Sequence, residues 1–375
     1  MEKRYSRSGV RRIRWKEFGA TSSARHESLR ADRVDTRFEL ARALTYARER
    51  ASADPIIILA APRSYSSVVA AMLGQHPQLY GLPEMELFSA ATMTEWWRLC
   101  ELRQGANAWA SHANYPRAHG AIRAVAELFF GGQTEETVRL AIGWLWRRSH
   151  FTTGLLLEEL AKRIQPRILV EKSTSNVYRI GYMQRADQMF PEARFIHLIR
   201  HPRGQGESVV RFIEARETTR GPLSRSNWVY QLGSDRGRER NGEKETALDP
   251  QRSWLTLNRN ICAFLKNMPA DRKMEVRGED LLRKPATVLK QIVGWLGLRT
   301  DRKAILAMKH PERSPFARFG PQGARFGGDG SFLRDPRLRP LRAKSHSLDG
   351  PLSWRSDGLG FSSEVSRMAK EFGYT

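Results

Sequence analysis

The sequence contains little cysteine and no long apolar stretch. Cys100 and Cys262 are the two cysteines among 375 residues, and their number and spacing exclude a disulfide framework and a cysteine-based zinc site. No run reaches the roughly 18 apolar residues that a membrane-spanning helix needs. The basic N-terminus also lacks the apolar core of a secretory signal. We therefore expect a cytoplasmic protein with reduced cysteines.

The sequence also lacks a GxxxxGK[ST] motif, which argues against an ordinary Walker-type ATPase. Its formal net charge is +23, and this excess favours an anionic ligand or an acidic partner. The basic residues are spread along the whole chain rather than interleaved with aromatic residues, and no recognition helix stands out. Nucleic acid is therefore not the expected partner. Monomer and homodimer both remain open.

Hydrophobic residues make up 40% of the chain, enough for a substantial core. Short apolar segments with the pattern of buried strands alternate with longer segments of helical periodicity. This alternation predicts an α/β fold around a central parallel sheet. The predicted strands are 56–60, 167–173, 194–200 and 273–277, and the predicted helices are 37–50, 68–73, 85–102, 120–130, 135–148, 153–164, 177–190, 203–217, 251–266, 284–296 and 361–372.

Composition divides the chain into three parts. Residues 1–50 form a basic extension with one helix, 51–300 form the α/β domain, and 301–375 form a C-terminal extension rich in Gly, Pro and Arg that packs on the same domain. Within the domain, 85–165 is a helical insert and 218–250 a flexible insertion. Most of the C-terminal segment 311–340 is predicted to be irregular.

Residues 55–84 form the segment around which the rest of the chain is organised. A buried strand at 56–60 is followed by a polar turn and then by a helix. Free N–H groups and the positive end of the helix dipole make such a turn an anion site. In the alternative interpretation the serines only cap the helix. The residues of the turn are Arg63, Ser64, Tyr65, Ser66 and Ser67.

Polar residues follow two further strands of the predicted sheet. Lys172 lies in the Glu171–Ser173 sequence after the second strand, and Arg200 ends the third, with Ser208 eight residues later. In an open parallel sheet, ligands bind at the carboxyl ends of the strands. These positions predict a site for a ligand that carries two separated anionic groups.

The chain resembles the sulfotransferases that use 3'-phosphoadenosine 5'-phosphosulfate (PAPS), in particular their bacterial and tyrosylprotein-like branch. The family's first turn reads R-S-G-[ST]-[ST], and an arginine followed by a serine eight residues later binds the 3'-phosphate. The resemblance covers residues 50–300 and implies a P-loop-like three-layer fold. The matching segments are 63–67, 76–77, 171–173, 194–208 and 276–282.

The resemblance implies a role for each of these residues. The 63–67 turn would hold the phosphosulfate, Arg200 and Ser208 the 3'-phosphate, and Lys172 and Arg63 the charge that develops on the leaving oxygen. Glu84 lies 21 residues after Arg63, at the position of the family's catalytic glutamate, and is the predicted base. The alternatives for the base are Glu86 and His76, and Glu84 itself could instead cap a helix that begins near residue 85. No metal is implied.

The chain departs from the family pattern at two positions. Tyr65 replaces the glycine of the first turn, and if that position needs a positive φ the tyrosine costs about 1–2 kcal/mol of strain. The alternative is a slightly different loop, with the ring packing over the nucleotide or the acceptor. Gly278 replaces an aromatic residue, a change from which little effect is expected.

The predicted function is PAPS-dependent sulfuryl transfer to a hydroxyl group of a small-molecule or carrier-bound acceptor. The tryptophan-rich helical insert is expected to hold the acceptor pocket, and Arg325 in the C-terminal segment to close over the nucleotide. Arg203 and Arg211 are expected at the surface. The alternatives are a degenerate protein that binds PAPS or its product without catalysis, and a basic protein that binds nucleic acid or membrane surfaces.

Overall fold

The computed structural model describes residues 54–101, 117–220, 249–341 and 346–375. The predicted N-terminal extension 1–50, with its helix 37–50, lies outside these residues, as does most of the 218–250 insertion. In the part of the chain that is described, no helix is both long and apolar enough to cross a membrane.

The centre of the fold is a five-stranded sheet in which every neighbouring pair of strands is parallel. Its strand order is β2-β3-β1-β4-β5. The prediction of an α/β fold around a central parallel sheet is confirmed. The strands are β1 (Ile56–Leu59), β2 (Leu79–Gly81), β3 (Ile168–Glu171), β4 (Arg194–Ile199) and β5 (Lys273–Arg277).

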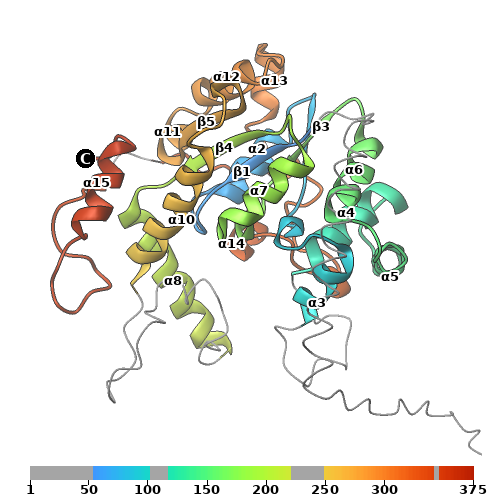
Figure 1. Cartoon of the computed structure of the whole chain (residues 1–375), viewed down its shortest axis with the longest axis horizontal. Helices are drawn as coiled ribbons and strands as arrows, with labels where there is room; N and C mark the ends of the chain where they lie inside the picture. The colour runs from blue at the N-terminus through green and yellow to red at the C-terminus, as the bar shows by residue number, and fades with distance from the viewer. Residues whose placement is uncertain (1–53, 102–116, 221–248, 342–345) are drawn as a thin grey trace, which may run out of the picture.

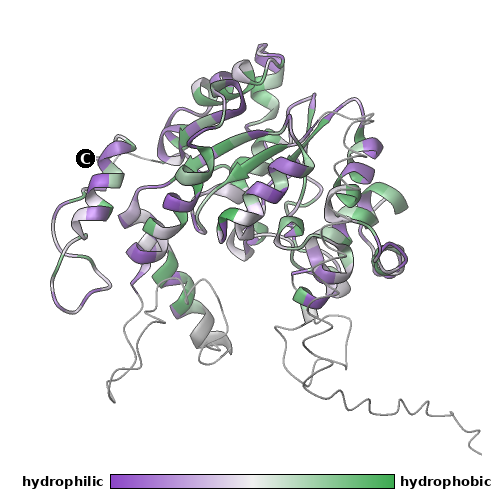
Figure 2. Ribbon diagram, in the orientation of Figure 1, coloured by the Kyte–Doolittle hydropathy of each residue, from purple (hydrophilic) through white to green (hydrophobic). Residues whose placement is uncertain are grey.

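Helices cover both faces of this sheet, which gives three layers (Figure 1). Successive side chains of a strand point to opposite faces, so Ile56 and Ile58 of β1 belong to one core cluster and Ile57 and Leu59 to the other. The first cluster packs against α2 (Ser66–Leu73), α12 (Pro285–Trp295) and α13 (Arg302–Ala307), and the second against α4 (His119–Phe130), α6 (Thr153–Ile164), α7 (Ile180–Met189) and α10 (Pro250–Leu265). The central strands β1 and β4 are accordingly largely apolar (Figure 2), whereas the edge strand β5 carries three charged residues.

Most predicted helices are confirmed within a few residues, among them α5 (Glu135–Trp146), α8 (Pro202–Arg220) and α15 (Ser363–Glu371). The short helix α11 (Gly278–Arg283) was not predicted. The predicted helix 85–102 is wrong in its first half. The helix there, α3 (Met93–Glu101), begins later, after the 3₁₀ turn η2 (Leu87–Ser89). Glu86 has a φ of 55°, a left-handed conformation that no α-helix can include.

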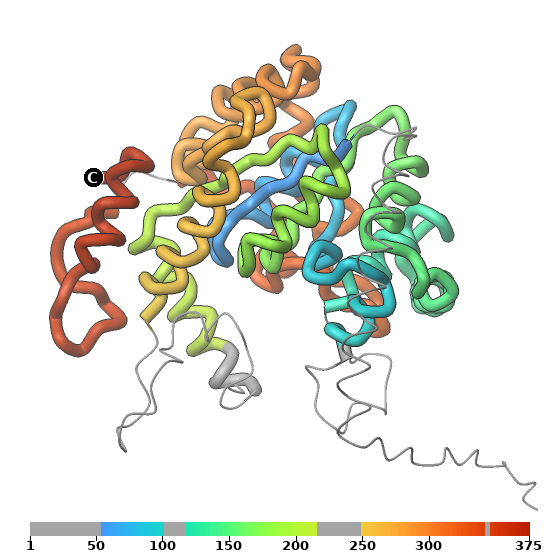
Figure 3. Tube along the Cα trace, viewed as in Figure 1, coloured from blue at the N-terminus to red at the C-terminus, as the bar shows by residue number. Residues whose placement is uncertain are grey.

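The C-terminal chain is irregular from the end of α13 to α15. In the view of Figures 1 and 3, α13 lies at the top, the short helix α14 (Gly330–Arg334) below the sheet and α15 at the left. Two 3₁₀ turns, η7 (Pro311–Arg313) and η8 (Gln322–Ala324), interrupt it. The prediction that this segment is mostly irregular is confirmed.

The strand order fixes where a ligand site can form. The chain leaves β1 toward the β2 edge of the sheet and leaves β4 toward the β5 edge, although β1 and β4 are neighbours. Their following loops therefore diverge and leave a crevice between the two carboxyl ends. Arg63 follows β1 and Arg200 follows β4 at this crevice.

Candidate active site

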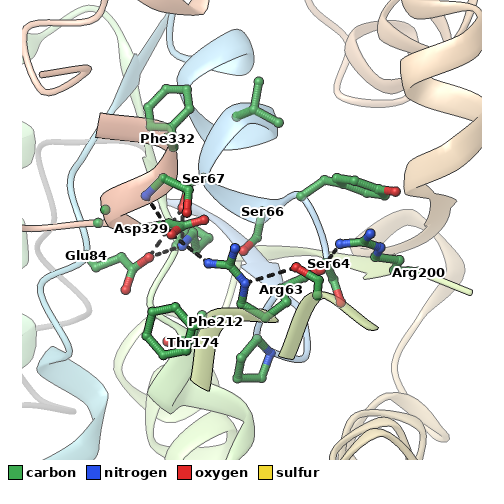
Figure 4. Close-up of a pocket in the computed structure, with 18 of the residues that line it drawn as sticks. Arg63, Ser64, Ser66, Ser67, Glu84, Thr174, Arg200, Phe212, Asp329 and Phe332 are labelled. Carbon is green, nitrogen blue, oxygen red and sulfur yellow. Dashed lines mark hydrogen bonds and ion pairs between the residues drawn. The ribbon is translucent and has the colours of Figure 1, made fainter. Parts of the chain in front are cut away.

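A cavity of about 660 Å³ opens at the carboxyl ends of the strands (Figure 4). Its wall contains the predicted phosphosulfate turn, the predicted base and cation, and the two residues predicted for the 3'-phosphate. The predicted residues in its wall are Arg63, Ser64, Tyr65, Ser66, Ser67, Glu84, Lys172, Arg200 and Ser208.

The turn after β1 has the conformation of an anion-binding loop. Ser64 and Ser66 are buried, and α2 begins at Ser66 without a side-chain cap on its N-terminus. The first N–H groups of α2 therefore remain available for an anion. Arg63 and Tyr65 have φ values of 67° and 64°, a left-handed backbone that costs each about 1–2 kcal/mol. Of the two possibilities that the sequence leaves open for the turn at residue 65, the structure has the positive φ.

Arg63 lies at the centre of the cavity, between the side that holds Glu84 and the side that holds Arg200 (Figure 4). Its Nε donates to the Ser208 hydroxyl at 3.2 Å, and its Nη1 lies 2.6 Å from a carboxylate oxygen of Asp329. Its guanidinium also lies over the Phe212 ring. Arg63 thus connects the loop after β1 with α8 and with the C-terminal segment.

Lys172 forms an ion pair with Glu84. The lysine follows β3, its side chain is 3% exposed, and its Nζ also donates to the Ser67 hydroxyl at 3.1 Å. A buried ammonium requires a partner, because its desolvation is otherwise costly. The predicted base and the predicted cation are therefore in direct contact.

The backbone around Glu84 is held from three directions. Its N–H donates to the Gly327 carbonyl at 2.8 Å, and the Ser173 hydroxyl accepts from the N–H groups of Met85 and Glu86 at 3.1 and 2.8 Å. Gly120 of α4 lies against its carbonyl, where a Cβ would come within 1.9 Å of the oxygen. The position of Glu84 is thus set by packing, and no helix cap is involved.

Glu171 supports this arrangement from beneath the cavity. It is fully buried and accepts hydrogen bonds from the Ser173 hydroxyl and from Asn176 at 2.7 Å. Burial raises the pKa of the Glu171 carboxyl to about 7. Through Ser173, this carboxyl helps to fix the backbone of residues 85 and 86.

On the other side of the cavity, Arg200 lies against the turn. Its Nη1 donates to the Arg63 carbonyl at 2.6 Å, and its guanidinium carbon lies 4.1 Å from the centre of the Tyr65 ring. Burial raises the pKa of the Tyr65 phenol and lowers that of the Arg200 guanidinium. Gln205 of α8 holds the same turn from below, donating to the Pro62 carbonyl at 2.9 Å.

Of the two alternative bases, only Glu86 reaches the cavity. Glu86 lines its wall and forms an ion pair with Arg117. His76 is buried away from the cavity: Nδ1 accepts from the Gln78 N–H at 3.2 Å and Nε2 lies 2.9 Å from the Arg299 carbonyl. Both ring nitrogens are thus used in holding two loops together.

Several other predicted residues lie elsewhere. Arg203 donates to carbonyl groups of residues 347–351, and Arg211 is 66% exposed. Arg325 lies over the Phe319 ring and is absent from the cavity wall, so its predicted closure over the nucleotide is wrong. None of the described tryptophans of the insert (Trp96, Trp97, Trp144 and Trp146) lines the cavity either, and Trp109 lies outside the described residues.

The C-terminal segment still contributes to the site, through residues that the sequence did not single out. Asp329 reaches Arg63, and Phe332 of α14 lies nearby in the wall (Figure 4). Arg337 and Arg339 also line the cavity, and both form ion pairs with Asp335. The sequence shows only that these residues belong to a Gly- and Arg-rich segment. This composition does not indicate which side chains face the cavity.

Comparison with known proteins identifies the family of this chain. The model of the sulfotransferase family matches residues 55–302, about two thirds of the chain, and the chain therefore belongs to this family. It adopts the family's P-loop-like three-layer fold. No curated protein sequence matches the chain.

Two solved structures have a similar fold. One is a sulfotransferase domain from the curacin biosynthetic pathway, with a TM-score of 0.60 and 21% identity, covering 87% of this chain and 99% of that domain. The other is the sulfotransferase domain of the Synechococcus PCC 7002 olefin synthase, with a TM-score of 0.59 and 24% identity, covering 87% of this chain and 97% of that domain.

Proposed function

We propose that the protein transfers the sulfuryl group of PAPS to an acceptor hydroxyl, with Glu84 as the base. The observation that supports this most directly is the contact among Glu84, Lys172 and Ser67 at the N-terminus of α2. It brings a proton acceptor, a buried cation and free N–H donors to one point of one cavity.

The cavity fits a nucleotide with anionic groups at both ends. Its volume of about 660 Å³ lies in the range of small-molecule sites. Lys172 and Arg63 supply positive charge near Glu84, and Arg200 supplies it on the far side of the turn. Arg200 lines the cavity, so its guanidinium can form charge-assisted hydrogen bonds with an anion there.

Each residue has a defined task in this proposal. PAPS supplies an activated sulfuryl group and a leaving nucleotide. Lys172, Arg63 and the first N–H groups of α2 stabilise negative charge near the transferred group. Glu84 accepts the proton of the acceptor hydroxyl. Arg200 and Ser208 bind the 3'-phosphate.

We propose a small-molecule or carrier-bound acceptor that enters beside Glu84. The cavity wall there combines the polar groups of Glu86 and Thr174 with the aromatic rings of Tyr178 and Phe212. The two similar structures are domains from a biosynthetic pathway and from an olefin synthase. For this reason, both carrier-bound and free hydroxyl compounds should be tested as acceptors.

The first test is binding of 3'-phosphoadenosine 5'-phosphate (PAP), measured by calorimetry. Wild-type protein should bind PAP, and Arg200→Ala and Ser208→Ala should each raise the Kd, the arginine change by about tenfold or more, because charge-assisted hydrogen bonds are the stronger ones. Lys290→Ala is the control, since Lys290 lies on the exposed side of α12. Unchanged PAP affinity in both cavity variants would contradict the proposed 3'-phosphate site.

The second test is turnover. Incubation with PAPS and mixtures of free and carrier-bound hydroxyl compounds, followed by mass spectrometry, should reveal products that have gained a sulfuryl group. PAP binding without transfer to any acceptor would favour a degenerate binding protein. Steeply salt-dependent DNA or liposome binding that PAP does not compete would favour a basic surface-binding protein.

A further inference from the structure

The ring of Tyr65 occupies a restricted place in the cavity wall. Tyr65 has a left-handed backbone with a φ of 64°, a conformation that glycine or asparagine adopts more readily than tyrosine. The sequence nevertheless has a large aromatic residue at the centre of the turn. Contacts of the ring with two other segments account for this choice.

The first contact is with Gly278, at the start of α11. A Cβ on residue 278 would lie 2.6 Å from Cδ2 and 3.3 Å from Cε2 of the Tyr65 ring. The lower value is shorter than any normal carbon–carbon contact, so the ring in its present position requires glycine at 278. The two departures from the family motif are therefore in contact, and the expectation that Gly278 has little effect is wrong.

The second contact is with Arg200. Its guanidinium carbon lies 4.1 Å from the centre of the Tyr65 ring, well within the range of a cation–π interaction. One N–H of the guanidinium donates to the Arg63 carbonyl at 2.6 Å. The ring and the carbonyl together restrict a side chain that otherwise has many rotamers.

We propose that Tyr65 is a positioning residue that orients Arg200 for the 3'-phosphate of the nucleotide, and that Gly278 provides the space for its ring. This inference rests on the proposed function. In this proposal Tyr65 acts on the nucleotide through Arg200, and its ring does not stack on the nucleotide or on the acceptor.

The experiment compares PAP binding and PAPS kinetics in two variants of Tyr65. Tyr65→Phe keeps the ring, and Tyr65→Asn removes it while retaining a residue that tolerates the left-handed backbone. We expect Tyr65→Phe to bind PAP within about twofold of wild type, and Tyr65→Asn to bind it about 3- to 30-fold more weakly. The KM for PAPS should rise in Tyr65→Asn by a larger factor than kcat falls.

Fluorinated phenylalanines at position 65 separate orientation from simple packing. Fluorine withdraws charge from the face of the ring and so weakens its attraction for a cation. PAP affinity should therefore fall step by step from phenylalanine to its mono-, di- and trifluoro analogues. Equal affinity across this series would show that the ring only fills space and would overturn the proposed role.

The role of Gly278 is tested in a double-mutant cycle. Gly278→Ala should displace the ring and weaken PAP binding in the wild-type background, but should cause no further loss in the Tyr65→Asn background. Gly181→Ala is the matched control, because a Cβ there meets nothing within 4 Å. An equal loss from Gly278→Ala in both backgrounds would overturn its link to Tyr65.

The outcomes distinguish this inference from the function on which it rests. A wild-type protein that does not bind PAP would contradict both. PAP binding by wild type with undiminished affinity in Tyr65→Asn would overturn the positioning role alone. Equal weakening in Tyr65→Phe and Tyr65→Asn would mean that the phenol hydroxyl is the important group, which also overturns an action of the ring on Arg200.

Discussion

Two segments of the chain line the same cavity but are held in place by different means. Residues 55–84 run continuously from β1 through the turn and α2 to β2 and Glu84. Residues 311–341 contain two 3₁₀ turns and one five-residue helix, and contacts with remote residues determine their path. Buried Arg123 donates to the Arg318 and Phe326 carbonyls at 2.8 and 2.9 Å.

The two segments therefore have different parts in the site. In the first, a strand, a helix and the turn between them hold the side chains that we propose take part in sulfuryl transfer. The second lines the cavity beside it, and among its contacts with the first are those from Gly327 to the Glu84 N–H and from Asp329 to Arg63. Changes in the first segment should therefore affect turnover most, and changes at the anchors of the second should affect stability and affinity.

The largest effect is expected at Glu84, in the first segment. Glu84→Gln removes the proposed base, and kcat should fall by about 10²- to 10⁴-fold, measured as sulfated product from PAPS and an identified acceptor. PAP affinity should change little, because glutamine keeps the size of the side chain. Glu86→Gln is the matched control, and a comparable loss of kcat there, with Glu84→Gln near wild type, would move the base to Glu86.

The next largest effect is expected on stability, at Arg123, which holds the second segment through two carbonyl groups. Arg123→Met leaves the Arg318 and Phe326 carbonyls without their donor, and the free energy of unfolding should fall by about 3–5 kcal/mol. Urea denaturation measures this change. Arg139→Met, at an exposed position on neighbouring α5, should change the unfolding free energy by about 0.5 kcal/mol at most. Equal effects of the two variants would mean that Arg123 does not anchor the segment.

A pH-dependent effect is expected beneath the first segment, at Glu171. Burial raises the pKa of its carboxyl from 4.5 to about 7, so folding favours the protonated form. Its contribution to stability is full below pH 4.5 and is lost as the pH rises through 7. Glu171→Gln removes this titration, and between pH 4.5 and 8 the unfolding free energy of wild type should fall by about 3 kcal/mol more than that of the variant. Parallel pH profiles would contradict the raised pKa.

The smallest effect is expected where the two segments meet. Asp329 places a carboxylate against Arg63, where it repels an anionic ligand. Asp329→Asn keeps the side-chain oxygen that accepts from the Ser331 N–H but removes the charge. PAP should then bind about two- to fivefold more tightly at low salt, with a smaller gain at high salt because the pair is partly exposed. Weaker binding would instead make Asp329 part of the site.

The comparison also shows how far the sequence could predict the site. Arg63, Lys172 and Arg200 were predictable because each directly follows a strand, and parallel strands bring their carboxyl ends together. Glu84 was predictable only by its distance from Arg63, since β2 has three residues and too little pattern of its own. Asp329 and Phe332 were not predictable, because an irregular segment has no periodicity that shows which side chains face a cavity.

The sequence by itself determined the parallel α/β fold, the polar turn at residues 63–67 and the positive charge around it. These follow from local patterns: apolar β-branched strands, a polar turn and a helix start. The tertiary structure alone decided that Gly120, Ser173 and Gly327 fix the backbone of Glu84, and that Tyr65 fits against Gly278 and Arg200. Such contacts join residues that are distant in the sequence, and they depend on how closely two backbones approach, which no local pattern records.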